Sequence, residues 1–112
     1  MEKEPEKETE NEGPDFTSPG EVTNLKATTP ADGTVTLTWT DPKDKDFAIV
    51  YAEFSFNHPT LGLQRLGWTT PKGYQTRTAE NLRGGVEYTV KVTTQDIVGN
   101  RSEGVTVKVT PR

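Results

Sequence analysis

The feature that most constrains the fold of this chain is the alternation of apolar and polar side chains in three separate segments. Residues 34–40 read Thr-Val-Thr-Leu-Thr-Trp-Thr, which places three apolar side chains on one side and four threonines on the other. Residues 87–95 and 105–109 alternate in the same way. A period of two is typical of β-strands with one buried and one solvated face. No segment shows a convincing 3.6-residue stripe, so we expect an all-β fold.

Turn sequences separate these runs at short intervals. Residues that favour turns, namely Pro, Gly, Asp and Asn, cluster at 29–33, 41–44, 71–73, 83–85 and 98–100. Short strands at this spacing predict a two-sheet antiparallel immunoglobulin-like sandwich of about seven strands. The chain has 112 residues, which is enough for one such domain and leaves little room for a second.

The predicted core takes side chains from both sheets. Residues 47–56 carry apolar groups on both faces; we assign Val50, Ala52 and Phe54 to the core, which turns Ile49 and Tyr51 outward. Facing side chains from the other strands would complete the core, namely Leu37, Trp39, Tyr88, Val90 and Val107.

The amino-terminal segment has a different composition. Residues 1–21 hold eight acidic side chains and two lysines, a net charge of −6, whereas the whole chain carries −4 and the remainder therefore +2. This segment contains too little apolar surface to offset the entropy of ordering. We predict a disordered acidic tether over residues 1–19 and a folded domain over residues 20–112. The tether would be a solvated spacer, or a stalk that lifts the domain from a surface or a neighbouring module.

Several features of this sequence resemble a fibronectin type III domain, over about 90 residues. They are the opening Pro-Gly-Glu-Val-Thr-Asn-Leu, a tryptophan with Asp-Pro shortly after it, and a leucine six residues before a tyrosine, found at residues 19–25, 39–42 and 82–88. In this family the tyrosine hydroxyl bonds upstream backbone and the leucine packs beneath it. The resemblance thus implies that Trp39, Leu82 and Tyr88 are structural core residues.

Two segments add to this resemblance or depart from it. Residues 96–104 are similar to a loop common in bacterial members of the family, and only this resemblance suggests a bacterial origin. Residues 57–73 form a long insertion that departs from the family pattern. Within it we expect at most a short edge strand at residues 64–68, with His58-Pro59 and Pro71 in loops.

Composition excludes several function classes. The two excess positive charges of residues 22–112 are scattered, so the concentrated basic stripe that nucleic-acid binding needs is missing. No stretch approaches 18 apolar residues, and Met1 is followed by charged residues where a signal peptide would be apolar. The chain is therefore either cytosolic or the mature part of an exported protein. It has no Cys, which removes disulfides and thiolate chemistry without choosing a compartment.

Catalytic and metal chemistry find little support. His58 is the only candidate general base, and we interpret it as a solvent-exposed loop residue. Residues 41–46 place three carboxylates in one turn, a pattern that can hold Ca²⁺. Two lysines lie among these carboxylates, however. Asp followed by Pro commonly begins a turn, which explains Asp41 without an ion. We expect no catalytic residues, no metal, no cofactor and no enzyme.

Three aromatic residues are the binding candidates. An outward Tyr51 with Trp68 on a neighbouring edge strand, and Tyr74 nearby, would form a platform that stacks on a sugar or docks another domain. The alternative is that residues 57–73 fold over residues 47–56 and bury these rings, which would also bury the leucines of that segment, Leu61, Leu63 and Leu66.

The resemblance implies a non-catalytic spacer or interaction module of a bacterial cell-surface or secreted protein, attached to the surface through a lipid anchor of the parent protein or by another route. The expected partners are neighbouring domains or another protein, and the domain itself is expected to be a monomer. The alternative function is a carbohydrate-binding accessory domain that uses Tyr51, Trp68 and Tyr74.

Overall fold

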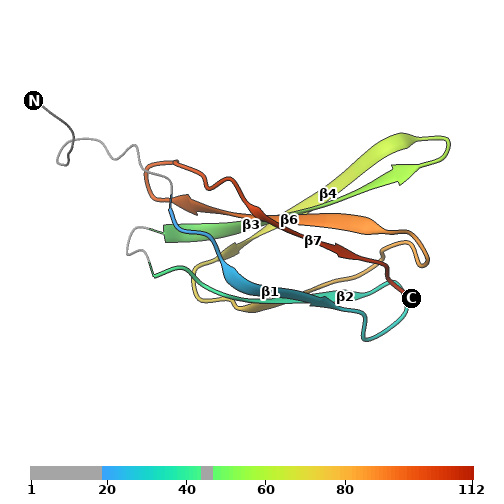
Figure 1. The fold of residues 1–112 in the computed structure, drawn as a ribbon, viewed down its shortest axis with the longest axis horizontal. Coiled ribbons are helices and arrows are strands. Elements are labelled where there is room, and N and C mark those ends of the chain that lie inside the picture. The colour runs from blue at the N-terminus through green and yellow to red at the C-terminus, as the bar shows by residue number, and fades with distance from the viewer. Residues whose placement is uncertain (1–18, 44–46) are drawn as a thin grey trace, which may run out of the picture.

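The fold of residues 19–43 and 47–112 is described by a computed structural model, which is an all-β structure (Figure 1). The predicted tether over residues 1–19 lies outside the described residues except for Pro19. Seven strands occur in the described residues, and no helix does: β1 (Thr23–Thr28), β2 (Val35–Thr40), β3 (Phe47–His58), β4 (Gly62–Pro71), β5 (Thr76–Ala79), β6 (Tyr88–Asp96) and β7 (Val105–Val109).

The strands form two antiparallel sheets packed face to face. One sheet has the order β1-β2-β5 and the other the order β4-β3-β6-β7. The alternation in β2 explains this packing, because its Val35, Leu37 and Trp39 are buried while the threonines between them face outward. The predicted seven-stranded two-sheet sandwich is confirmed.

The core lies between the two sheets and contains the predicted side chains. Val50, Ala52 and Phe54 of β3 are buried, and Trp39 is 4% exposed. The indole N–H of Trp39 donates a hydrogen bond of 2.9 Å to Asp41 Oδ1, so this polar group is satisfied at the end of β2. The remaining predicted members, Leu37, Tyr88, Val90 and Val107, also belong to the core, with Val107 partly buried.

The start of β6 carries the interaction that the family resemblance implies. The backbone N–H of Arg83 donates to the hydroxyl of Tyr88 at 2.8 Å, and Leu82 is buried beside it. The phenol is thereby held against the connection between β5 and β6, and this tyrosine corner fixes the entry of β6 into the core.

The interpretation of residues 57–73 as a long irregular insertion is wrong. β3 and β4 form a continuous hairpin, paired in register from Ile49–Pro71 to His58–Gly62. His58 ends β3 and is partly buried, rather than exposed in a loop, and its Nδ1 accepts hydrogen bonds from the backbone N–H groups of Thr60 and Leu61. These bonds organise the turn between β3 and β4, which the sequence pattern does not predict.

The outer part of this hairpin extends beyond the sandwich. β3 pairs with β6 only as far as Ser55–Thr89, whereas its pairing with β4 continues to His58. Figure 1 shows the tip projecting at the end of the domain where the chain terminates. The leucines of this segment do not cover β3, contrary to the alternative prediction: Leu61, Leu63 and Leu66 are 61%, 56% and 45% exposed. Strand alternation turns Leu63, opposite Asn57, to the outer side of the hairpin and Leu66, opposite the buried Phe54, to the inner side.

The two ends of the described domain lie at opposite ends of β6. The carbonyl of Gly20 accepts a hydrogen bond from Thr94 Oγ1, and the carbonyl of Arg112 accepts one from the Gly33 N–H. Pro111 likewise accepts a bond from Gly85, close to the start of β6. Six residues of strand separate Tyr88 from Thr94, which is about 20 Å. The chain therefore enters at one end of the sandwich and leaves at the other (Figure 1).

Candidate functional site

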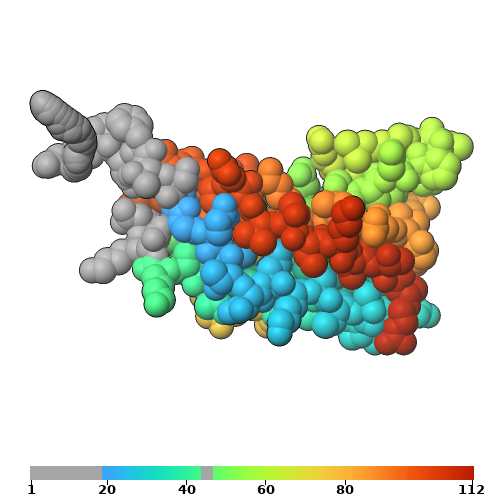
Figure 2. Space-filling view, in the orientation of Figure 1, coloured from blue at the N-terminus to red at the C-terminus, as the bar shows by residue number. Residues whose placement is uncertain are grey.

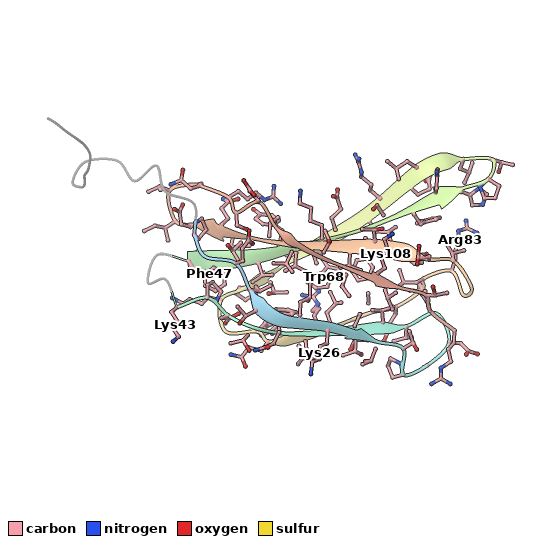
Figure 3. The ribbon with its side chains drawn as sticks, viewed as in Figure 1. Lys26, Lys43, Phe47, Trp68, Arg83 and Lys108 are labelled. Carbon is pink, nitrogen blue, oxygen red and sulfur yellow. The ribbon has the colours of Figure 1, made fainter. Side chains whose placement is uncertain are left out.

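Trp68, a predicted binding residue, faces inward. It lies opposite Ala52 in the register of β3 and β4, and Ala52 belongs to the core. Its ring centroid is 6.3 Å from that of Phe54, and Figure 3 places the indole between the two sheets. The guanidinium of Arg77, from β5, lies 4.7 Å from the indole centroid and donates to the Thr69 carbonyl at 3.3 Å. Arg77 therefore covers Trp68 and joins the two sheets along their open side.

Tyr51 faces outward, as predicted, on the opposite side of the sheet from Trp68. It is in register with Thr69 on one side and Thr93 on the other, and the guanidinium of Arg101 lies 3.9 Å from its ring centroid. Tyr74 is exposed in the connection between β4 and β5. The predicted platform is therefore not formed, because strand alternation turns Tyr51 and Trp68 to different faces. A binding role for any one of these residues remains a prediction.

A concavity of about 330 Å³ lies on the outer face of the four-stranded sheet, where Tyr51 is found. One row of residues crosses the sheet from Gly67 on β4 through Glu53 on β3 to Lys91 on β6. Gly67 creates part of the space because it has no side chain. The walls combine one aromatic ring with charged and hydroxyl groups: Tyr51, Ala52, Glu53, Gly67, Lys91, Thr93, Arg101 and Ser102. Both positive and negative side chains therefore reach the opening.

The loop between β6 and β7 holds Arg101 in place beside this concavity. Asp96 begins the loop, is only 3% exposed, and accepts hydrogen bonds from the backbone N–H groups of Val98 and Asn100 and from the Asn100 side chain. Ser102 fastens the other end of the loop, since its hydroxyl and its N–H both bond the backbone of Thr94. Arg101 lies between these anchors and donates to Thr93 Oγ1 at 3.3 Å.

The ionisation of Asp96 reflects these contacts. Burial alone raises the pKa of a carboxyl group, but hydrogen bonds from the Asn100 side chain and from the backbone of Asn100, Val98 and Gly99 favour the charged form. The hydrogen bonds together outweigh burial and lower the pKa of Asp96 below its usual value of 3.8. The carboxylate is therefore a structural acceptor that orders the loop.

His58 and Asp41, which were considered for catalysis and for calcium binding, both take part in hydrogen bonds that order turns. His58 Nδ1 contacts the hydroxyl of Thr60 at 3.2 Å, and the backbone bonds to the same nitrogen make it a turn-ordering group. The oxygens of Asp41 accept hydrogen bonds from Trp39 and from the Gly73 N–H. Asp44 and Asp46, the other two carboxylates of the turn over residues 41–46, lie outside the described residues. Among residues 19–43 and 47–112 no group of three or more His, Cys, Asp or Glu could hold a metal ion.

Sequence reasoning missed the apolar surface of the hairpin, where Leu61, Leu63 and Leu66 are exposed. These leucines do not form one patch, because strand alternation turns Leu63 and Leu66 to opposite faces. Figure 2 shows the hairpin standing out beyond the rest of the domain. The signal in the sequence was the Leu-Gly-Leu of residues 61–63, in which a turn glycine (φ 76°) is flanked by apolar residues. A second apolar pair, Ile97 and Val98, is exposed in the loop after β6, at the opposite end of the domain.

Sheet order and the tyrosine corner together define a fibronectin type III fold. The solved structures with this fold include the fibronectin type III domain of the human collagen alpha-1(XX) chain, with 18% identity over 89% of this chain and 91% of that one, and a TM-score of 0.68. The FN5 domain of Drosophila Lar matches at 18% identity, 84% and 98% coverage, and a TM-score of 0.61. These likenesses show the fold alone.

A bacterial protein also contains this fold. The Clostridium perfringens spore cortex lytic enzyme SleM matches at 18% identity over 82% of this chain and 28% of that one, with a TM-score of 0.64. No protein-family model and no curated protein sequence matches the chain. Within the part of the chain that the structure describes, no helix is long and apolar enough to cross a membrane.

Proposed function

We propose that this domain is a non-catalytic interaction module of a bacterial cell-surface or secreted protein, placed in line between other parts of a longer chain. The observation that carries the proposal is the position of its ends, held at Thr94 and at Gly33, at opposite ends of the sandwich. A domain with this arrangement lengthens a chain by its own long dimension. The similarity to fibronectin type III domains such as those of human collagen XX and Drosophila Lar supports a non-catalytic role, and the similarity to part of SleM supports a bacterial setting.

The exposed leucines of the hairpin favour an interaction role over that of a passive spacer. The hairpin that carries them projects at the end of the sandwich where Arg112 lies (Figure 1). Leu63 and Leu66 lie on opposite faces of this hairpin, so apolar surface is offered on both of its sides. The hairpin therefore provides a contact for another domain or for a neighbouring protein, without any change in the core.

A photo-crosslinking experiment tests this function in intact cells of the source organism. A photoreactive residue at position 63, in the full-length parent protein, should give a defined crosslinked product, and Leu61→Ser/Leu66→Ser should abolish it. The matched control is Ile97→Ser/Val98→Ser, which removes two even more exposed apolar side chains at the other end and should leave the product unchanged. If no product depends on the leucines, the domain is a spacer.

Antibody labelling tests the location. Antibodies against residues 19–112 should label intact cells, or detect the protein in the culture medium, before the cells are permeabilised. Labelling only after permeabilisation would contradict an extracellular or surface location. Release of the labelled protein by a lipase that cuts lipid anchors would identify lipid anchoring in the parent protein.

Carbohydrate binding is a second candidate, favoured by the concavity beside Tyr51. A sugar ring would contact the exposed part of this phenol while its hydroxyl groups bond Glu53 and Lys91. Titration with oligosaccharides, followed by amide chemical shifts, should then move the signals of Gly67 and Lys91. Tyr51→Ala should remove these shifts, whereas Tyr74→Ala should not. Unchanged spectra would rule out this function for the oligosaccharides used.

A further inference from the structure

The expectation that positive charge is scattered over the domain does not hold for the two sheets, because it is concentrated on one face of the sandwich. The outward strand positions of β4-β3-β6-β7, together with Arg101, carry four basic side chains and one acidic side chain, namely Arg65, Lys91, Arg101, Lys108 and Glu53. We call these five residues the basic face. On the opposite sheet the outward strand positions carry threonines, Asn24 and a single charge, Lys26. Figure 3 shows Lys26 and Lys108 on the two opposite sides of the molecule.

Among residues 19–43 and 47–112, most of this positive charge has no carboxylate partner. Arg65 is the one basic residue of the basic face with a described carboxylate within 4 Å, and that contact with Glu53 is long, at 3.9 Å, and exposed. Arg101 lies against the Tyr51 ring and Thr93, and the stem of Lys91 lies close to Gly104. The charged groups of Lys91, Arg101 and Lys108 are therefore available to an external anion.

The chain carries an acidic segment immediately before the residues that the structure describes. Residues 1–18 contain seven carboxylates and two lysines, a net charge of −5. The described chain begins where Gly20 bonds Thr94 and Glu21 accepts a bond from the Gly104 N–H. Thr93 and Ser102, which line the concavity, are immediate neighbours of these contacts. An extended chain covers about 3.3 Å per residue, so a few residues before Pro19 suffice to reach the concavity.

We propose that the basic face is a binding surface for an extended acidic segment, and that its occupant is the chain's own residues 1–18. Charge complementarity supplies the attraction, and exposed charges interact weakly when the partners are separate molecules. The covalent connection at Pro19 compensates, because a short tether gives an effective concentration on the order of millimolar.

Paramagnetic relaxation in the full chain tests this proposal. The protein has no Cys, so Thr9→Cys provides a unique site for a nitroxide label. At low ionic strength we expect the label to broaden the amide signals of Glu53, Gly67 and Lys91 far more than those of Thr36 and Thr38 on the other sheet. About 1 M NaCl, which shortens the screening length to about 3 Å, should remove the difference.

Charge-reversed variants identify the surface. Lys91→Glu/Arg101→Glu in the labelled chain should abolish the selective broadening. The matched control, Lys26→Glu/Lys43→Glu, changes the net charge equally on the other side of the molecule and should retain it. A second variant leaves the folded domain untouched and replaces five glutamates by glutamine, which should also abolish the broadening: Glu2, Glu4, Glu6, Glu8 and Glu10.

Three results would overturn the proposal. Equal broadening of both sheets would show that residues 1–18 do not select the basic face. Broadening that persists in Lys91→Glu/Arg101→Glu would show that these charges are not the binding groups. Selective broadening that also occurs when spin-labelled chains without ¹⁵N are mixed with unlabelled ¹⁵N chains would identify a second copy as the occupant.

Discussion

The Tyr88 hydroxyl accepts a 2.8 Å hydrogen bond from the backbone N–H of Arg83, five residues earlier in the chain. This bond satisfies a donor in the connection between β5 and β6, and it fixes a phenol whose ring also contacts Phe54 and Phe56. The Tyr88 side chain thus both packs in the core and fixes the conformation of the backbone that leads into β6.

Removing only this hydroxyl should weaken the fold without disturbing its packing. Tyr88→Phe should lower the free energy of unfolding by about 1 kcal/mol, the typical contribution of one hydrogen bond, with some addition for the unsatisfied N–H of Arg83. Urea unfolding followed by fluorescence measures this change. Tyr74→Phe, at an exposed position, is the control and should have no effect; equal stabilities of the two variants would contradict the role of the tyrosine corner.

The two tryptophans should differ sharply in their contribution to stability. Trp39→Ala should cost about 3–5 kcal/mol, because it opens a cavity in the core, and this is a large part of the 5–15 kcal/mol that stabilises a typical domain. Trp68→Ala should cost less, since this indole is only partly buried. Thermal unfolding of both variants provides the comparison. A smaller loss for Trp39→Ala would show that the centre of the core lies elsewhere.

The loop after β6 should depend on pH through Asp96. The pKa of Asp96 is lowered in the folded protein, so its stabilising contribution is complete above the unfolded value of about 3.9 and is lost as the pH falls through the lower folded value. Asp96→Asn should therefore destabilise the domain at pH 7. This difference from the unmodified protein should shrink as the pH is lowered below about 4.

Unfolding measured by denaturant at several pH values checks this dependence. Glu103→Gln, at an exposed position of the same loop, is the control and should leave the pH profile unchanged. A stability difference for Asp96→Asn that stays constant from neutral to acidic pH would show that the charge of Asp96 contributes nothing.

Arg77 should control the exposure of Trp68. Arg77→Ala removes the guanidinium from the indole and the hydrogen bond to Thr69, and an exposed cation–π contact contributes about 0.5–1 kcal/mol. We expect a red shift in tryptophan emission and easier quenching by acrylamide. Arg83→Ala, which changes an exposed side chain away from Trp68, should leave the emission unchanged. An unshifted spectrum in Arg77→Ala would show that the guanidinium does not cover the ring.

Local patterns were sufficient to predict the two-sheet sandwich and its core, although not the β3–β4 hairpin. The alternation in residues 34–40 indicates which side of β2 is buried without knowledge of its neighbours, and the spacing of Leu82 and Tyr88 identifies the tyrosine corner. These features depend on residues close together in the sequence. Their consequences for the core were therefore predicted correctly.

The arrangement of the candidate site depends on contacts between distant residues. The register that places Trp68 opposite Ala52 decides that the indole faces inward, and no pattern within residues 57–73 specifies that register. The concavity likewise needs Gly67 on β4 and Lys91 on β6 in one row on either side of Glu53, with Arg101 held by the loop that Asp96 and Ser102 anchor. The sequence indicates the residue types, but only the assembled sheet brings them together.

The length of β4 has a consequence for solubility. Its outer side is a sheet edge with ten residues of backbone, and long uncovered edges invite pairing with other chains. Arg77 of β5 donates a hydrogen bond to the carbonyl of Thr69 on β4, and the charged Arg65 lies further along β4. These two arginines disfavour pairing of the β4 edge with other chains. A chain that loses both should therefore form fibrils or precipitates at concentrations at which the native protein stays in solution.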